Sequence, residues 1–251
     1  MTLEERLAAA LKTARSKPAA DAEQGAKRGY SQSMSNVFAT ELGAFLRERG
    51  CIEARPAAPG QLGGSGAERR MAGGIGAKKV DVTWATPEAG LIFAASIKTI
   101  NAKDAATGNY QKNLTNRRDD LLFESVTLHR RFPYAVLLGL FCLDQGAAAD
   151  EKKKGDKLTR RSTFENAHQR LRLFSGRDDP ADREEQFEFL AILLVDNESD
   201  PPRVTAYGAG DHTSVVSLDC VLNDALLKVS ERNPDFYKYD ESKRVISKLN
   251  K

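Results

Sequence analysis

The chain has 251 residues, of which 29% are charged and 41% are hydrophobic, and 38 Lys and Arg against 35 Asp and Glu give a net charge of +3. That length suits one large domain or two small ones, with a hydrophobic core large enough to be stable without disulfides or structural metals. The composition excludes collagen-like, coiled-coil and wholly disordered chains, and no apolar run approaches the roughly 20 residues that a membrane helix needs.

The N-terminus and the cysteines indicate the compartment. Residues 1–6 lack the apolar stretch of a secretory signal. The three cysteines, Cys51, Cys142 and Cys220, are well separated, which is typical of reduced thiols rather than of a disulfide framework. We therefore expect a cytoplasmic protein with no membrane partner.

The small net charge hides two oppositely charged segments. Residues 151–177 carry nine Lys and Arg against three Asp and Glu, and residues 178–200 carry nine Asp and Glu against one Arg. The basic segment is either a solvated face or an attractor of a polyanion, for which phosphate neutralisation is the main source of affinity. The acidic segment faces solvent or a partner protein.

The first 33 residues differ in composition from the rest of the chain. Residues 3–17 have helical spacing, and the segment 18–27, rich in Ala, Gly and charges, is typical of a loose linker. We therefore divide the chain into an N-terminal helical extension and linker, residues 1–33, and a single domain, residues 34–251.

A second helix and a long loop follow the linker. The helix is capped by Ser33 or Ser35 and ends at Gly50, and its apolar stripe consists of Phe38, Leu42, Phe45 and Leu46. Residues 56–76 contain many Gly and Ala and predict a long loop, a kind of segment that is often functional.

Hydrophobic periodicity assigns the remaining elements. The predicted strands are 79–84, 91–99, 134–143, 187–195 and 203–207, the predicted helices are 110–131, 163–174 and 218–229, and a loop is expected at 147–157. The order α–β–β–α–β–α–β–β–α predicts one α/β domain with a mixed sheet and helices on both sides.

A strand pair brings three polar residues to one surface. Asp81 lies between two valines in the first strand, and Ser96 and Lys98 share a face of the second. Charges in apolar strands are costly unless they are paired or bind a metal. Two interpretations remain open: an Asp81–Lys98 salt bridge, or a hydrolytic site in which a carboxylate holds Mg²⁺ and the lysine orients water.

Asp81, a turn and Ser96-Ile97-Lys98-Thr99 resemble the PD-(D/E)xK nuclease superfamily, which includes restriction endonucleases and DNA-repair nucleases. The resemblance covers roughly residues 34 to 145. It implies a restriction-endonuclease-like fold, with a mixed β-sheet flanked by helices, and a site that uses Mg²⁺, with Mn²⁺ as a substitute, to hydrolyse DNA. Asp81 would bind the metal and Lys98 would activate water.

One position departs from the family pattern. Ser96 stands where the family usually has Asp or Glu, and some restriction enzymes of the superfamily show the same Ser-x-Lys with a carboxylate supplied from a nearby helix. Glu41, on the preceding helix, is the first candidate, and Glu124 and Asp120, on the following helix, are the second. The predicted catalytic residues are thus Asp81, Lys98, Glu41 and Ser96, with Asp81 and Glu41 as metal ligands.

Predicted DNA contacts lie in two segments. Residues 109–118 are rich in amides and cations, and the N-terminus of their helix favours anions. This polar run is either a phosphate grip or an ordinary polar helix face. The residues assigned to DNA binding are Gln111, Asn113 and Arg117, together with the loop arginines Arg69 and Arg70.

Three functions remain open. The first is a Mg²⁺-dependent DNA endonuclease of restriction or phage defence, for which the family implies a homodimer. The second is a repair or recombination nuclease on the same fold. The third is a DNA-binding or assembly module that has lost catalysis at Ser96.

Overall fold

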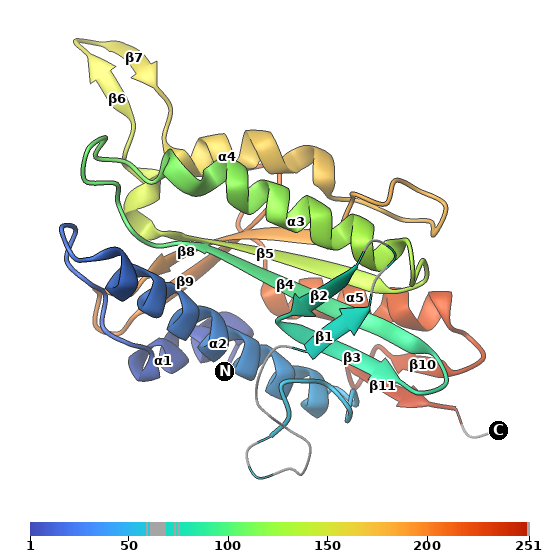
Figure 1. The fold of residues 1–251 in the computed structure, drawn as a ribbon. Coiled ribbons are helices and arrows are strands. Elements are labelled where there is room, and N and C mark those ends of the chain that lie inside the picture. The colour runs from blue at the N-terminus through green and yellow to red at the C-terminus, as the bar shows by residue number, and fades with distance from the viewer. Residues whose placement is uncertain (59, 61–68, 73, 75, 250–251) are drawn as a thin grey trace.

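A five-stranded mixed β-sheet forms the centre of the molecule (Figure 1) in this computed structural model, which describes residues 1–58, 60, 69–72, 74 and 76–249. The central pairs β4–β5 and β5–β8 are parallel, and the outer pairs β3–β4 and β8–β9 are antiparallel. The strands lie in the order β3 (Val82–Thr86), β4 (Gly90–Ile100), β5 (Val136–Asp144), β8 (Phe189–Asp196) and β9 (Arg203–Gly208).

Helices cover both faces of this sheet because its central strands are apolar on both sides. In β5, Leu138, Leu140 and Cys142 face one helix layer, while Leu137, Phe141 and Leu143 face the other. The first layer is α1 (Leu3–Ala10), α2 (Gln24–Glu48) and α5 (Leu218–Arg232), and the second is α3 (Leu114–His129) and α4 (Thr163–Leu171). None of the helices in the described part of the chain has the length and apolar character that crossing a membrane requires.

Three two-stranded hairpins stand apart from the main sheet. They are β1 (Arg69–Ala72) with β2 (Ala77–Val80), β6 (Lys152–Lys154) with β7 (Lys157–Arg160), and β10 (Tyr237–Asp240) with β11 (Val245–Lys248). Short 3₁₀ turns complete the described structure at η1 (Leu11–Thr13), η2 (Gln111–Asn113), η3 (Gln145–Ala148) and η4 (Arg172–Phe174).

The predicted α/β class, a mixed sheet between helices, is confirmed. The more specific restriction-endonuclease-like assignment stays a prediction. The loop expected at residues 147–157 differs, because part of it forms the β6–β7 hairpin. Gly155 and Asp156 connect the two strands, with Gly155 at a φ of 59°, and a two-residue turn of this kind is a hairpin signal in the sequence.

The N-terminal residues belong to the same core as the rest of the chain. Leu3, Leu7 and Leu11 are fully buried among residues of α2, α5 and the sheet. In addition, α2 begins at Gln24, ten residues before the expected start of the domain at residue 34. The division at residues 33 and 34 therefore falls inside a continuous helix. The apolar stripe of the first helix is buried in the same core, so residues 1–33 pack as part of the domain.

Gly50 ends α2 as its sequence position predicts. It has a φ of 97°, which favours glycine, and a Cβ atom there would lie 1.9 Å from the carbonyl oxygen of Ile246. The N–H of Ile246 donates to the carbonyl of Arg49 at 2.8 Å, so β11 is held directly against the end of α2.

Candidate active site

Asp81 lies at the point where the chain leaves the β1–β2 hairpin and enters the main sheet. The β3–β4 ladder starts at Val82 opposite Ala95, so β4 continues beyond the end of its neighbour. There the N–H of Ile97 donates to Oδ2 of Asp81 at 2.6 Å. The carboxylate thus replaces a missing strand partner, and its position is fixed beside the C-terminal half of β4.

Lys98 pairs with Glu124 of α3. Ser96 and Lys98 lie on the face of β4 that contacts the α3 layer, as the alternation predicts, and Ser96 is buried. The distance from Lys98 Nζ to Glu124 Oε1 is 2.7 Å, and the side chains are 13% and 7% exposed. One of the two open interpretations was an Asp81–Lys98 salt bridge, and the ion pair that Lys98 makes is with Glu124 instead.

The second carboxylate oxygen of Glu124 is a further feature of this pair. Oε2 is buried and has no hydrogen-bond partner within the described residues. A buried charged acceptor left without a partner costs free energy, so an unpaired oxygen of this kind suggests a ligand atom, a water or a cation.

A divalent cation fits this donor set only if other ligands complete its shell. Among the residues that the structure describes, no three His, Cys, Asp or Glu side chains are grouped so that they could hold a metal. Glu124 pairs with the Lys98 ammonium from the helix, and Asp81 accepts from the N–H of Ile97, the residue before Lys98. Asp81 and Lys98 line the adjacent cavity, and Glu124 is not among its lining residues. Mg²⁺ is commonly held by one or two carboxylates, with water and phosphate oxygens as its remaining ligands, and this set matches that habit.

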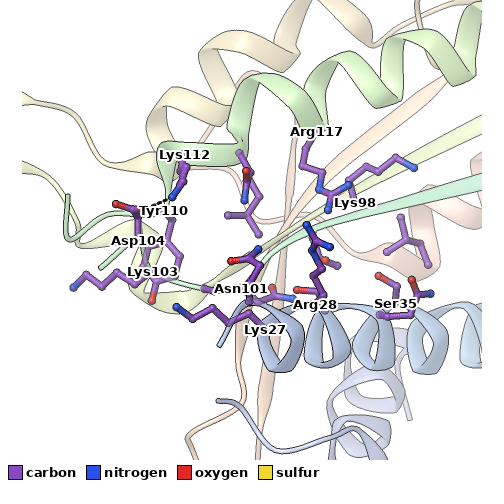
Figure 2. A pocket seen from close by; sticks show the side chains of 18 of the residues that line it. Lys27, Arg28, Ser35, Lys98, Asn101, Lys103, Asp104, Tyr110, Lys112 and Arg117 are labelled. Carbon is purple, nitrogen blue, oxygen red and sulfur yellow. Dashed lines mark ion pairs between the residues drawn. The ribbon is translucent and has the colours of Figure 1, made fainter. Parts of the chain in front are cut away.

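A cavity of about 650 Å³ opens at this end of β4, between α2 and the turn that leads into α3 (Figure 2). Asp81 and Lys98 both line it. The parallel strands β4 and β5 both end here. Binding sites of α/β proteins often lie at the carboxyl ends of such strands. The volume is typical of small-molecule sites and suits a short stretch of nucleic-acid backbone rather than a whole duplex.

The walls of the cavity are positively charged. They carry two carboxylates, those of Asp81 and Asp104, and six cations, those of Lys27, Arg28, Lys98, Lys103, Lys112 and Arg117. Figure 2 shows Arg28 reaching in from α2 and Arg117 reaching in from α3. This excess of positive charge favours an anionic ligand.

Asp104 is neutralised by its own loop. Its carboxylate pairs with Lys112 at 2.7 Å and accepts hydrogen bonds from the backbone and side chain of Thr107. The bond from Lys112, followed by those from Thr107, lowers the pKa of Asp104. Asp104 therefore shapes the rim and stays ionised, and the cavity cation that it pairs with is Lys112.

Asn101 lines the cavity and was not among the predicted site residues. It follows β4 directly and is 3% exposed, and neither its amide nitrogen nor its amide oxygen has a hydrogen-bond partner in the described chain. A buried side-chain amide whose donor and acceptor both lack hydrogen-bond partners is rare in a folded protein. Its position after a strand, at a carboxyl end, was the one signal in the sequence.

Cys142 lies on β5 in the neighbouring strand. Burial, with a smaller contribution from the charge of Asp81, raises the pKa of this thiol. It is a neutral core group and not a nucleophile.

Glu41 does not join this site. Its Oε2 accepts from Nε of Arg6 at 3.4 Å, and α1 therefore covers it. The residues of α2 that line the cavity lie closer to its N-terminus: Gln24, Lys27, Arg28, Ser31, Gln32 and Ser35. The carboxylate that the structure places beside Lys98 is that of Glu124, which was a second choice, because α3 and not α2 covers this face of β4.

The predicted DNA contacts fall in different places. Asn113 and Arg117 line the cavity, and Arg117 also pairs with Asp120 at 3.2 Å. Gln111 lies outside the cavity, and its Nε2 donates to the carbonyl of Arg161 at 3.2 Å.

Arg69 and Arg70 form part of β1, paired with Val80 and Lys79, so the backbone of Arg69 lies beside the residue that precedes Asp81. Their side chains, and most of the loop before them, lie outside the described residues.

Comparison with protein-family models, with curated proteins and with solved structures finds no match to this chain. The interpretation of the site therefore depends on its own geometry.

Proposed function

We propose that this protein is a Mg²⁺-dependent DNA endonuclease that hydrolyses phosphodiester bonds, with restriction or phage defence as its biological role. The observation that carries the proposal is the unpartnered Oε2 of Glu124, in an ion pair with Lys98 and next to a cationic cavity. Asp81 and Glu124 are the proposed metal ligands, and Lys98 is the proposed catalytic cation. In this proposal, Glu124 of α3 supplies the carboxylate that is missing at Ser96.

Each of these side chains has a role that its position supports. Asp81 is held by the N–H of Ile97, which keeps its carboxylate at the mouth of the cavity. Lys98 is held by Glu124, so its ammonium is available to orient water and to stabilise charge that develops on a phosphate. A divalent cation, when bound, supplies Lewis-acid polarisation of that phosphate.

The cations on the cavity wall supply binding. Lys27 and Arg28 of α2 and Arg117 of α3 approach the same space from opposite sides (Figure 2). Lys and Arg that neutralise phosphates are the main source of affinity for nucleic acids. The backbone of the substrate is thus held between the two helices, next to Asp81 and Lys98.

The test is cleavage of plasmid and linear duplex DNA in Mg²⁺, with EDTA as the control. Lys98→Ala and Asp81→Ala should abolish cleavage. Because Lys98→Ala leaves Glu124 buried without its partner, it also costs stability, and the double variant Lys98→Gln/Glu124→Gln removes both charges together. We expect the double variant to fold, as judged by circular dichroism, and to be inactive.

Matched variants on the two helices separate Glu124 from the other candidates. Glu124→Gln should raise the Mg²⁺ concentration needed for half-maximal cleavage, while Asp120→Asn, on the same helix, and Glu41→Gln, on α2, should leave it unchanged. Full activity of the folded Lys98→Gln/Glu124→Gln variant would show that the pair is only structural.

The substrate preference distinguishes the remaining functions. Cutting of plain plasmid at discrete positions supports restriction or phage defence. Preference for branched or damaged DNA would instead indicate a repair nuclease, and DNA binding without any Mg²⁺- or Mn²⁺-dependent cutting would indicate a non-catalytic module.

A further inference from the structure

We infer that the β6–β7 hairpin is a cationic arm that binds the phosphate backbone of the same nucleic acid beyond the cavity, so that the protein grips a duplex at two places. This inference rests on the proposed function for the identity of the ligand.

The arm is exposed and strongly basic. Residues 151–161 contain six Lys and Arg against two acids, and the side chains from 151 to 159 are all exposed. The cations are Lys152, Lys153, Lys154, Lys157, Arg160 and Arg161. The contact between Lys153 and Glu151 is long, at 4.0 Å, and screening by solvent makes it weak.

No residue of the arm belongs to either apolar core cluster of the described chain. Its strands have three and four residues and form a sheet of their own. Its one large apolar side chain, Leu158, is 46% exposed. An isolated two-stranded hairpin is marginal in water, so the arm depends on its base for its position.

The base of the arm is anchored by the buried Asp150. Its carboxylate accepts from the backbone N–H of Tyr110 at 2.9 Å and from the N–H and hydroxyl of Thr163, each at 2.6 Å. The carbonyl of Asp150 accepts from Arg160 at 2.6 Å. One side chain therefore joins the arm, the start of α4 and the cavity rim.

The same contacts place the arm next to the cavity. Tyr110 lines the cavity, and Gln111, the next residue, donates to the carbonyl of Arg161 at the end of the arm. Lys112 and Asn113 line the cavity from the same turn. Figure 1 shows the hairpin projecting from the end of the molecule where α3 and α4 begin and where β4 ends.

A nucleic-acid backbone is the ligand that matches this layout. The cavity takes only a short stretch of backbone, and the arm extends the positive surface by the length of a strand, roughly 13 Å for four residues. Double-stranded DNA carries one charge per about 1.7 Å of its axis, so a duplex seated at the cavity presents further phosphates to the arm.

The experiment measures the salt dependence of DNA binding in EDTA, which prevents cleavage. The variant Lys152→Gln/Lys154→Gln/Lys157→Gln removes three charges from the arm. On a duplex of about 30 bp, roughly three helical turns, the slope of log K against log salt should become shallower by up to about 2.7, at about 0.9 for each phosphate contact. On a single-stranded dinucleotide, which is short enough to lie within the cavity, the slope should not change.

The β10–β11 hairpin provides a matched control. It is also a separate two-stranded sheet with exposed lysines, and it lies at the opposite end of the molecule (Figure 1). Lys238→Gln/Lys243→Gln/Lys248→Gln removes the same charge there, and we expect the slope on the duplex and on the dinucleotide to stay that of the parent protein. Both triple variants should melt with the parent protein, because the substituted side chains are exposed.

An unchanged slope for the arm variant on the duplex, or an equal loss in the control variant, would overturn the inference. If the arm variant forms fewer oligomers than the parent protein in gel filtration and keeps the parent slope, the inference is also overturned, because the arm would then bind another protein chain. A shallower slope without any Mg²⁺-dependent cutting supports the arm and contradicts the nuclease proposal. Cutting with an unchanged slope does the reverse.

Discussion

At the scale of single residues, Asn101 is a side chain that costs the protein stability and that we expect to contribute to ligand binding. Its amide is buried at the cavity and has both its donor and its acceptor unpaired in the described chain. A buried polar group without partners costs about 1–3 kcal/mol. Figure 2 places Asn101 beside Lys27 and Arg28, where a phosphate or a sugar oxygen could meet those needs.

We expect Asn101→Leu to raise the free energy of unfolding by about 1 kcal/mol and to weaken DNA binding several-fold. The first effect follows from removing an unsatisfied amide from the interior, and the second from losing its contacts with the ligand. Urea unfolding and a binding titration measure the two quantities on the same preparation.

Asn233→Leu is the matched control, because the Asn233 side-chain amide donates to the carbonyl of Val229 at 2.9 Å. This variant should lose stability and keep DNA binding. If Asn101→Leu also loses stability and keeps binding, its amide is structural and the cavity has lost one proposed contact.

The candidate site also shows which residue positions a sequence predicts. Asp81, Ser96 and Lys98 were placed by strand alternation, which depends only on neighbours in the chain. The choice between Glu41 and Glu124 depended on which helix covers which face of β4. Both helices have a carboxylate near their apolar stripe, so only the tertiary arrangement, with Glu41 held by Arg6 and Glu124 by Lys98, decides between them.

At the level of elements, a buried ionic cluster joins α3, β8 and α5. Glu188 accepts from Arg177 at 2.8 Å and from Arg232 at 2.7 Å, and its other oxygen accepts from the N–H of Leu137 at 2.7 Å and contacts His129 at 3.3 Å. Burial alone would raise the pKa of Glu188, but His129, Arg232 and the N–H of Leu137 outweigh it and lower the pKa to about 2.

This pKa predicts how stability depends on pH. The ordinary pKa is 4.5, so the unfolded chain binds the proton first, and the stabilisation by Glu188 is complete above about pH 4.5 and is lost as the pH falls toward 2. Glu188→Gln should therefore be less stable than the parent protein at pH 7, by on the order of 3 kcal/mol, and the difference should shrink across that window.

Urea unfolding between pH 2 and pH 7 measures this difference. Glu241→Gln, a change at an exposed acid, is the control and should follow the parent protein at every pH. A Glu188→Gln deficit that stays constant down to pH 2 would contradict the assignment, because it would mean that the cluster does not depend on the charge of Glu188.

Elements with a strong period were predictable, and elements that depend on their anchors were not. The central strands have continuous apolar runs, and α5 has a clear apolar stripe, so the order of apolar residues along the chain was enough to locate them. The β6–β7 hairpin has no apolar face, and its position depends on Asp150, which contacts Tyr110 and Thr163 far along the chain. Hydrophobic periodicity within a short stretch of sequence cannot predict such a contact.

At the scale of the whole molecule, the acidic segment 178–200 is largely occupied by the protein itself. Asp178 pairs with Lys228, Glu184 pairs with Arg130 at 2.7 Å, and Asp196 pairs with Arg203 at 3.6 Å. Glu188 is buried in its own cluster. Much of the charge that could have served a partner protein therefore neutralises neighbouring cations, while the cations of the cavity and the arm are left in excess.

The N-terminal helix tests whether the chain unfolds as one unit. Trp84, the single tryptophan, lies in β3 and contacts Tyr237 of β10 with ring centroids 5.0 Å apart, and its fluorescence therefore reports on the sheet. Leu7 of α1 is 1% exposed and belongs to the same apolar core as Trp84. We expect Leu7→Ala to lower the free energy of unfolding by about 2–5 kcal/mol, as cavity-forming substitutions do.

Because α1 shares that core, the loss should appear as a shift of one transition, seen equally by Trp84 fluorescence and by circular dichroism. Leu173→Ala is the matched control, since Leu173 is 58% exposed and its truncation removes little buried surface. A transition that moves in circular dichroism and leaves the Trp84 signal in place would restore residues 1–33 as a separately folding extension. Coincident shifts would show that α1 unfolds together with the sheet that carries Asp81 and Lys98, as one unit.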